Sequence, residues 1–79
     1  MTEQKIQAKR IKQLEKDGYY VIKLINTNKN GIPDLIAIKK GADVLFSEIK
    51  TKTGKLSKIQ EYRQKELEKH GFKTEIFRG

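Results

Sequence analysis

Three residues near the middle of the chain have side chains of the types that hold a divalent cation and hydrolyse a phosphodiester. Asp34 follows a proline in the run Gly-Ile-Pro-Asp-Leu, and Glu48 and Lys50 come 14 and 16 positions later in the run Ser-Glu-Ile-Lys. Because side chains alternate along a strand with a period of two, Glu48 and Lys50 share one face. If the segment that starts at Asp34 pairs with this strand, two carboxylates and an ammonium group converge.

The chemistry of such a cluster follows from electrostatics. Two carboxylates that face each other repel, and a divalent cation relieves the repulsion. Mg²⁺ binds one or two carboxylates and substrate phosphate oxygens, polarises the phosphate and activates a water. Lys50 would orient or deprotonate that water, or stabilise charge in the transition state. Each motif alone has a simpler interpretation, since Glu-x-Lys is common on solvated strands and Pro-Asp in turns; their pairing favours a metal site.

Composition indicates one small basic domain, residues 1–79. A chain this short buries roughly 60% of its unfolded surface, and only 35% of its residues are hydrophobic, so we expect a thin core and a partner subunit. The net charge of +8 and the pI near 9.8 favour a polyanion such as DNA. The simpler alternative is a basic protein that is merely soluble.

Several classes of protein are excluded by what the sequence lacks. There is no cysteine, so disulfide scaffolds and thiolate zinc sites are excluded, and a single histidine, His70, excludes His-rich metal sites. The position of His70 near the expected end of a helix suits a capping role. No long apolar run indicates a membrane span or signal peptide, so we expect a cytoplasmic protein with no membrane partner.

Periodicity and capping residues predict the order α-β-β-β-α-β. Thr2 and the Ser57–Gln60 capping box begin helices, and Gly18 and Gly71 follow their ends. The strand that begins at Asp34 should form a hairpin with the strand after it, and the last strand should lie parallel to that one. The fold class is α/β, or mixed α+β: a small mixed sheet flanked by helices. The expected helices are 3–17 and 57–70, and the expected strands are 19–25, 34–40, 44–50 and 72–77.

The motifs, taken in order, resemble the PD-(D/E)xK nuclease superfamily and, more narrowly, the virus-type replication–repair nuclease (VRR-NUC) family. The ordered set is Glu3, the run ending in Pro-Asp34, the run Glu48-Ile-Lys50, and Lys-Thr-Gly-Lys-Leu-Ser-x-x-Gln ending at Gln60. The resemblance spans nearly the whole chain and implies a restriction-endonuclease-like core. It implies an endonuclease that uses Mg²⁺ or Mn²⁺ and hydrolyses DNA, structure-selective like a Holliday-junction resolvase. It further implies a homodimer. Because the family has stand-alone viral members, it also implies a virus-encoded enzyme that acts in a bacterial host.

The resemblance also implies a role for each matching residue. Ile49 would contribute its backbone carbonyl to the metal, and Glu3 would complete the site from the first helix. Glu3 and Gln60 also suit purely structural roles, because an acid in the first turn complements the helix dipole and Gln60 already belongs to the capping box. The implied metal ligands are Asp34, Glu48, Ile49 and Glu3, and the implied catalytic residues are Lys50, Glu48, Asp34 and Gln60.

Lysines flanking the proposed site are expected to contact DNA phosphates, which position a duplex without reading its sequence. A solvated surface is the alternative for any one of them. The competing function is a non-catalytic basic module that binds nucleic acid. Asp34 and Glu48 argue against it, because two acids in a binding surface would repel phosphate. The apolar faces of both helices are thin, which favours a symmetric dimer that acts on a branched or four-way junction. The candidate lysines are Lys39, Lys40, Lys52, Lys55 and Lys58.

Overall fold

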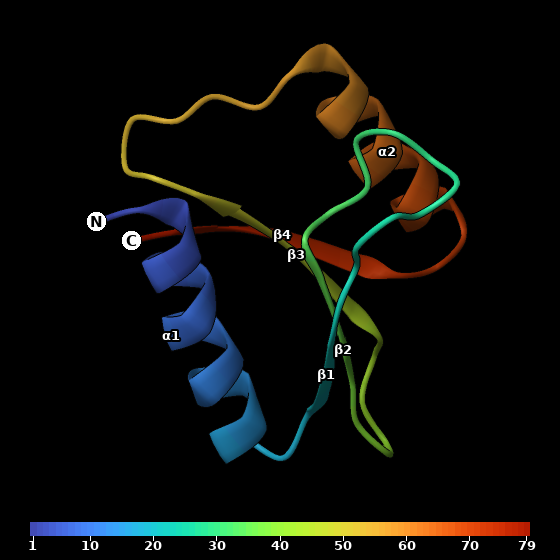
Figure 1. Ribbon diagram of the computed structural model, residues 1–79. Helices are drawn as coiled ribbons and strands as arrows, with labels where there is room; N and C mark the ends of the chain where they lie inside the picture. The colour runs from blue at the N-terminus through green and yellow to red at the C-terminus, as the bar shows by residue number, and fades with distance from the viewer.

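The computed structural model describes all residues, 1–79, and confirms the order α-β-β-β-α-β (Figure 1). Every predicted element is present, and each observed end lies within two residues of its predicted position. The elements are α1 (Glu3–Lys16), β1 (Tyr20–Lys23), β2 (Leu35–Ile38), β3 (Leu45–Lys50), α2 (Lys58–Lys69) and β4 (Lys73–Arg78).

The four strands form one mixed sheet in the order β1-β2-β3-β4. β2 is antiparallel to both of its neighbours, β1 and β3, and β4 runs parallel to β3 after the crossover through α2. The hairpin and the parallel last strand were both predicted, and both are confirmed. Leu35 pairs with Ser47 in the hairpin, which sets the register of the residues at its open end.

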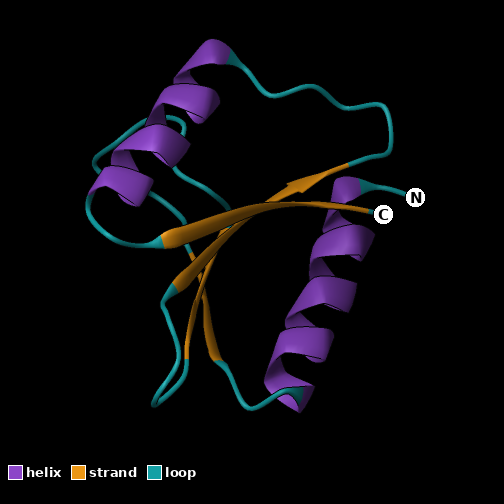
Figure 2. Cartoon of the chain, turned by 180° about the vertical axis from the view of Figure 1, so that it is seen from behind, coloured by secondary structure: helices purple, strands orange, loops and turns teal.

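The helices lie on opposite sides of the sheet (Figure 2). α1 covers one face and buries the core, made of Ile6, Leu14, Leu35, Ala37 and Ile49. α2 lies over the other face near the edge strand β4, where Phe46 meets Phe72 at 5.6 Å between ring centroids.

Local capping determines where the helices begin and end. The Thr2 hydroxyl accepts a hydrogen bond from Lys5, and Ser57 and Gln60 form the predicted reciprocal capping box. Gly18 and Gly71, directly after the two C-caps, both adopt positive φ, a conformation that glycine adopts with little strain. These signals fix the ends of both helices, and therefore the residues at which the loops between helices and strands begin.

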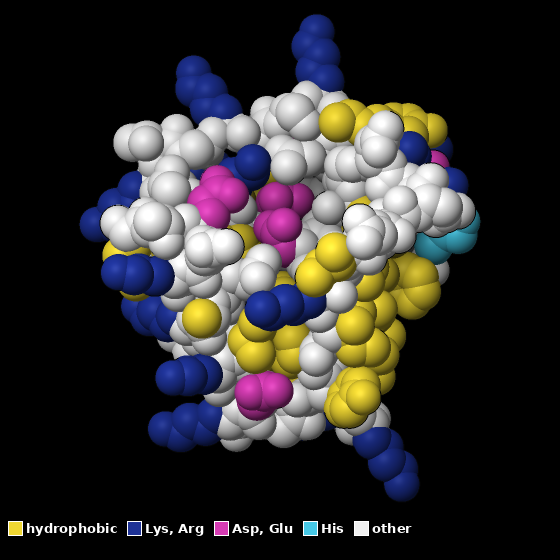
Figure 3. Space-filling view, in the orientation of Figure 1, with side chains coloured by type: hydrophobic (Ala, Val, Ile, Leu, Met, Phe, Trp, Pro, Cys, Tyr) yellow, Lys and Arg dark blue, Asp and Glu magenta, His cyan; other side chains and the backbone are white.

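The face of the sheet opposite α1 remains largely uncovered. Only 9 of 79 residues are buried, which matches the thin core expected from composition. In Figure 3 hydrophobic atoms form a broad area over the lower part of this face, below a group of acidic atoms. The exposed large residues on or beside this face include Tyr20, Ile22, Ile38, Ile76 and Phe72. Neither helix is long and apolar enough to cross a membrane.

Candidate active site

The hairpin register brings Asp34 and Glu48 together. Leu35 pairs with Ser47, so Asp34, one residue earlier, falls opposite Glu48, and directly opposed residues project from the same face. Asp34 Oδ2 also accepts a hydrogen bond of 2.8 Å from the backbone N–H of Ile49. This bond fixes the Asp34 carboxylate against β3 beside Glu48.

Glu48 is the most unusual titratable group in the molecule. Its side chain is buried, with 3% of the residue exposed. Burial is the main cause that raises the pKa of Glu48 to about 8, and the Asp34 carboxylate adds to it by its charge and by accepting a hydrogen bond from the protonated form. Lys50 lowers this pKa and Glu3 raises it, both by smaller amounts. A buried acid beside another acid is the electrostatic condition that a bound cation would relieve.

Gln60 reaches Glu48 from α2. Its side-chain amide donates to Glu48 Oε2 at 3.4 Å, while its carbonyl oxygen accepts from the Ser57 backbone at 3.0 Å in the capping box. Gln60 therefore caps the helix and contacts the acid at once, since the capping box aims its amide at Glu48. Lys50 projects from the same face as Glu48, and its stem lies beside Gly54 in the next loop.

The other two predicted metal ligands, Glu3 and Ile49, do not lie beside Asp34 and Glu48 as a pair of opposed side chains does. Glu3 is exposed at the start of α1, near enough for its charge to act on Glu48. Ile49 lies between Glu48 and Lys50 with its side chain in the core and its N–H bound to Asp34. No three Asp, Glu or His side chains gather closely enough to hold one ion, so the paired acids of the site are Asp34 and Glu48.

The predicted DNA-contacting lysines fall into two groups. Three of them, Lys52, Lys55 and Lys58, are exposed in or just after the loop that follows Lys50. The expectation that Lys39 and Lys40 flank the acids is wrong, because β2 begins after Asp34 and these lysines follow its opposite end. Lys39 instead donates to the Asp17 carbonyl at 2.7 Å, at the C-terminus of α1.

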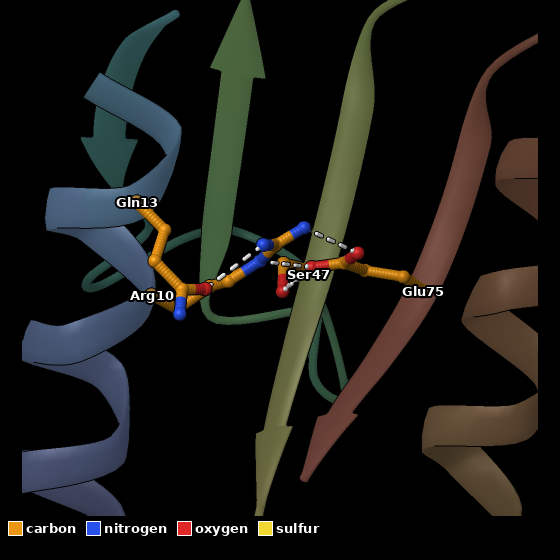
Figure 4. A network of polar contacts seen from close by, with 4 residues as sticks. All are labelled: Arg10, Gln13, Ser47 and Glu75. Atoms are coloured by element: carbon orange, nitrogen blue, oxygen red, sulfur yellow. Dashed lines mark hydrogen bonds and ion pairs between the residues drawn. The ribbon is translucent and has the colours of Figure 1, made fainter. Parts of the chain in front are cut away.

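A polar network on the other face of β3 was not predicted (Figure 4). Arg10 of α1 donates two hydrogen bonds of 2.8 Å to the Glu75 carboxylate on β4, and the Ser47 hydroxyl donates to the same carboxylate at 2.6 Å. The signal that the sequence offers for this contact is spacing, because Arg10 lies four residues from both Ile6 and Leu14, the buried residues of α1. Because Ser47 precedes Glu48 on β3, the network ties α1 and β4 to the strand that carries the acid.

Comparison with known proteins supports the resemblance over the full length of the chain. The family model described as the VRR-NUC domain matches residues 1–79. No curated protein matches the chain, and no solved structure matches it either. All of the acids, the lysine and the glutamine described above lie inside the matched region.

Proposed function

The chain belongs to the VRR-NUC domain family, a family of nuclease type, and on this premise we propose that it is a metal-dependent endonuclease that hydrolyses DNA phosphodiesters with Mg²⁺ or Mn²⁺. The observation that carries the proposal is the pair formed by half-buried Asp34 and buried Glu48, on one face with Lys50. A nuclease has nucleic acid as its partner, and the net charge of +8 suits that partner.

The residues fit a small, hard cation. Asp34 and Glu48 offer oxygen donors, which Mg²⁺ and Mn²⁺ prefer, and there is no thiolate to select a softer metal. Asp34 Oδ2 is held by the Ile49 N–H, which directs the carboxylate toward the position that a cation shared with Glu48 would occupy. The raised pKa of Glu48 reflects burial and carboxylate repulsion that a cation would remove. When bound, the cation supplies Lewis-acid polarisation of the phosphate and a water of lowered pKa.

The protein groups then have separate tasks. Asp34 and Glu48 hold the cation, and the Gln60 amide orients Glu48 by donating to Oε2. Lys50, on the same face, orients the attacking water or stabilises the charge of the transition state. As the family resemblance implies, the 3′ oxygen is the leaving group, so in-line attack by water leaves a 5′-phosphate and a 3′-hydroxyl.

Cleavage assays with four-way junction and linear duplex test this proposal. Wild-type protein should cut with Mg²⁺ or Mn²⁺ and not with Ca²⁺, and Lys50→Ala should lose about 100-fold or more in rate while it still binds DNA. Lys12→Ala, an exposed lysine on α1, is the matched control and should cut normally. Cleavage by Lys50→Ala at the wild-type rate, or no cleavage by the wild type with either metal, would show that the site is misassigned.

We also propose that two copies associate through the uncovered face of the sheet and act together on branched DNA. The exposed Tyr20, Ile22 and Ile38 lie on this face, and a monomer would leave them in water. Sedimentation at micromolar concentration should show a dimer for the wild type and a monomer for Ile22→Glu. A monomeric wild type with full activity on junctions would contradict the dimer.

A further inference from the structure

Two loops connect directly to the acidic site, and neither contains an acidic residue of its own. The β1–β2 loop, residues 24–33, ends at Asp34, and the β3–α2 loop, residues 51–57, begins after Lys50. The first lies beside α2, and the second lies beside the chain termini, where Met1 and Gly79 share a hollow with Thr51 to Thr53 (Figure 1). The site is therefore flanked by two loops with polar or basic side chains.

The β1–β2 loop is held by its backbone. Arg63 Nε donates to the carbonyl of Asn30 at 2.8 Å, and the Arg63 side chain is only 16% exposed. Gly31 adopts φ +78° and lies so close to α2 that an added Cβ would be about 3.0 Å from the backbone of Ile59. A bond from the Leu24 N–H to the Asp34 carbonyl, 2.8 Å, closes the base of the loop. These main-chain contacts, together with the buried side chain of Pro33 at its end, set the position of the loop.

The β3–α2 loop is held in the same manner. Arg78 Nη1 donates to the carbonyls of Thr51 and Gly54, the first at 3.0 Å. The Gly54 N–H donates to the Thr51 carbonyl at 3.2 Å, which closes a tight turn against Lys50. One guanidinium group thus fixes each loop through backbone carbonyls.

This arrangement leaves many polar side chains of both loops exposed to solvent. All residues from Ile25 to Asn30 are exposed, and so are Lys52, Thr53 and Lys55. Amide, hydroxyl and ammonium groups on a backbone that is already ordered bind with less loss of conformational entropy than those of a mobile loop. These are the groups that bind DNA phosphates and base edges.

We infer that the β1–β2 loop is a DNA-contacting element, and that the DNA strand to be cut passes between it and the β3–α2 loop. Lys29 and the amides of Asn28 and Asn30 contact one flank of the scissile phosphate, and Lys52 and Lys55 contact the other. Arg63 and Arg78 are positioning residues, which act through the loop backbones. This inference rests on the proposed nuclease function, because it takes Asp34 and Glu48 as the point of cleavage.

Binding measurements in the Lys50→Ala background, with Mg²⁺, separate contact from catalysis. Lys29→Ala should raise Kd for duplex DNA roughly threefold to tenfold at low salt, and should lower the slope of log K against log salt by about 0.9. Lys12→Ala removes another exposed lysine, which lies on α1 outside the loops, and should change neither quantity. An unchanged Kd and slope in Lys29→Ala would overturn the inference.

Substitution of Arg63 should affect DNA binding differently from substitution of Lys29, because Arg63 is not expected to contact DNA. Arg63→Ala should raise Kd with no change in the salt slope, and Arg63→Lys, which can still donate to the Asn30 carbonyl, should recover most of the affinity. A reduced slope in Arg63→Ala, or a wild-type Kd, would refute its positioning role. If the wild type binds DNA through Lys29 but cuts none with Mg²⁺ or Mn²⁺, the nuclease function fails while the loop assignment stands.

Discussion

The stability of the metal-free protein should depend on the protonation of Glu48. Its pKa in the fold is about 8, against an ordinary value of 4.5. Between these pH values the folded protein binds a proton that the unfolded chain has released. The free energy of unfolding contributed by this group therefore falls as pH rises through the interval, and the decrease levels off above pH 8.

The magnitude follows from the same two values. At about 1.36 kcal/mol per pKa unit, the full decrease is about 5 kcal/mol, of which about 3 kcal/mol is reached by pH 7. Domains of this size are stable by only about 5–15 kcal/mol in total. Glu48→Gln keeps the shape of the side chain and cannot ionise, so it should be more stable than the wild type by about 3 kcal/mol at pH 7. The two proteins should be nearly equal near pH 4.5.

Urea unfolding followed by far-UV circular dichroism, in EDTA from pH 4.5 to pH 9, measures this difference. Thermal unfolding should show a Tm for Glu48→Gln roughly 12–24 °C above that of the wild type at pH 7. Glu15→Gln, an exposed position on α1, is the matched control and should follow the wild type at every pH. If the curves of the wild type and Glu48→Gln stay parallel between pH 5 and pH 8, Glu48 is not a protonated, buried acid in the free protein.

Three further predictions concern the metal, the polar network and the β1–β2 loop. Mg²⁺ should raise the Tm of the wild type at pH 8 but not that of Asp34→Asn, and an equal rise in both would place the cation elsewhere. Arg10→Ala should destabilise the fold by about 2 kcal/mol in urea, because it leaves a partly buried carboxylate without its cation; a loss below about 0.5 kcal/mol would show that the network contributes little. Gly31→Ala should destabilise more than Gly41→Ala by roughly 2 kcal/mol, since both have positive φ but only Gly31 is pressed against α2, and equal losses would contradict that contact.

The elements of this fold could be predicted because their signals are local. Caps at Thr2 and Ser57, and glycines after each helix, mark ends within the sequence itself. The meeting of Asp34 and Glu48 was also predictable, because a short hairpin connects their strands and its register is the shortest-range pairing in the sheet. The crossover rule then placed β4 parallel to β3.

The contacts that were not predicted join residues far apart in the chain. Arg63 and Asn30 are 33 positions apart, and Arg10 and Glu75 are 65 apart. Nothing in a loop with three asparagines and one lysine indicates which arginine will bind its backbone. The error at Lys39 has the same origin, since nearness in sequence to Asp34 was taken as nearness in space, and a strand of four residues separates them.

The placement of the acid on β3 shows how the site can keep two carboxylates together without a cation. β3 has a strand on each side and is buried from Phe46 to Ile49, so it cannot shift to relieve the repulsion. The Ile49 N–H holds Asp34 on one face, and Ser47 is bound to Glu75 on the other. Because neither acid can move away, the free protein lowers the charge by protonating Glu48, and a divalent cation would displace that proton. The same rigidity that destabilises the free fold at high pH therefore keeps the ligands in place for the metal.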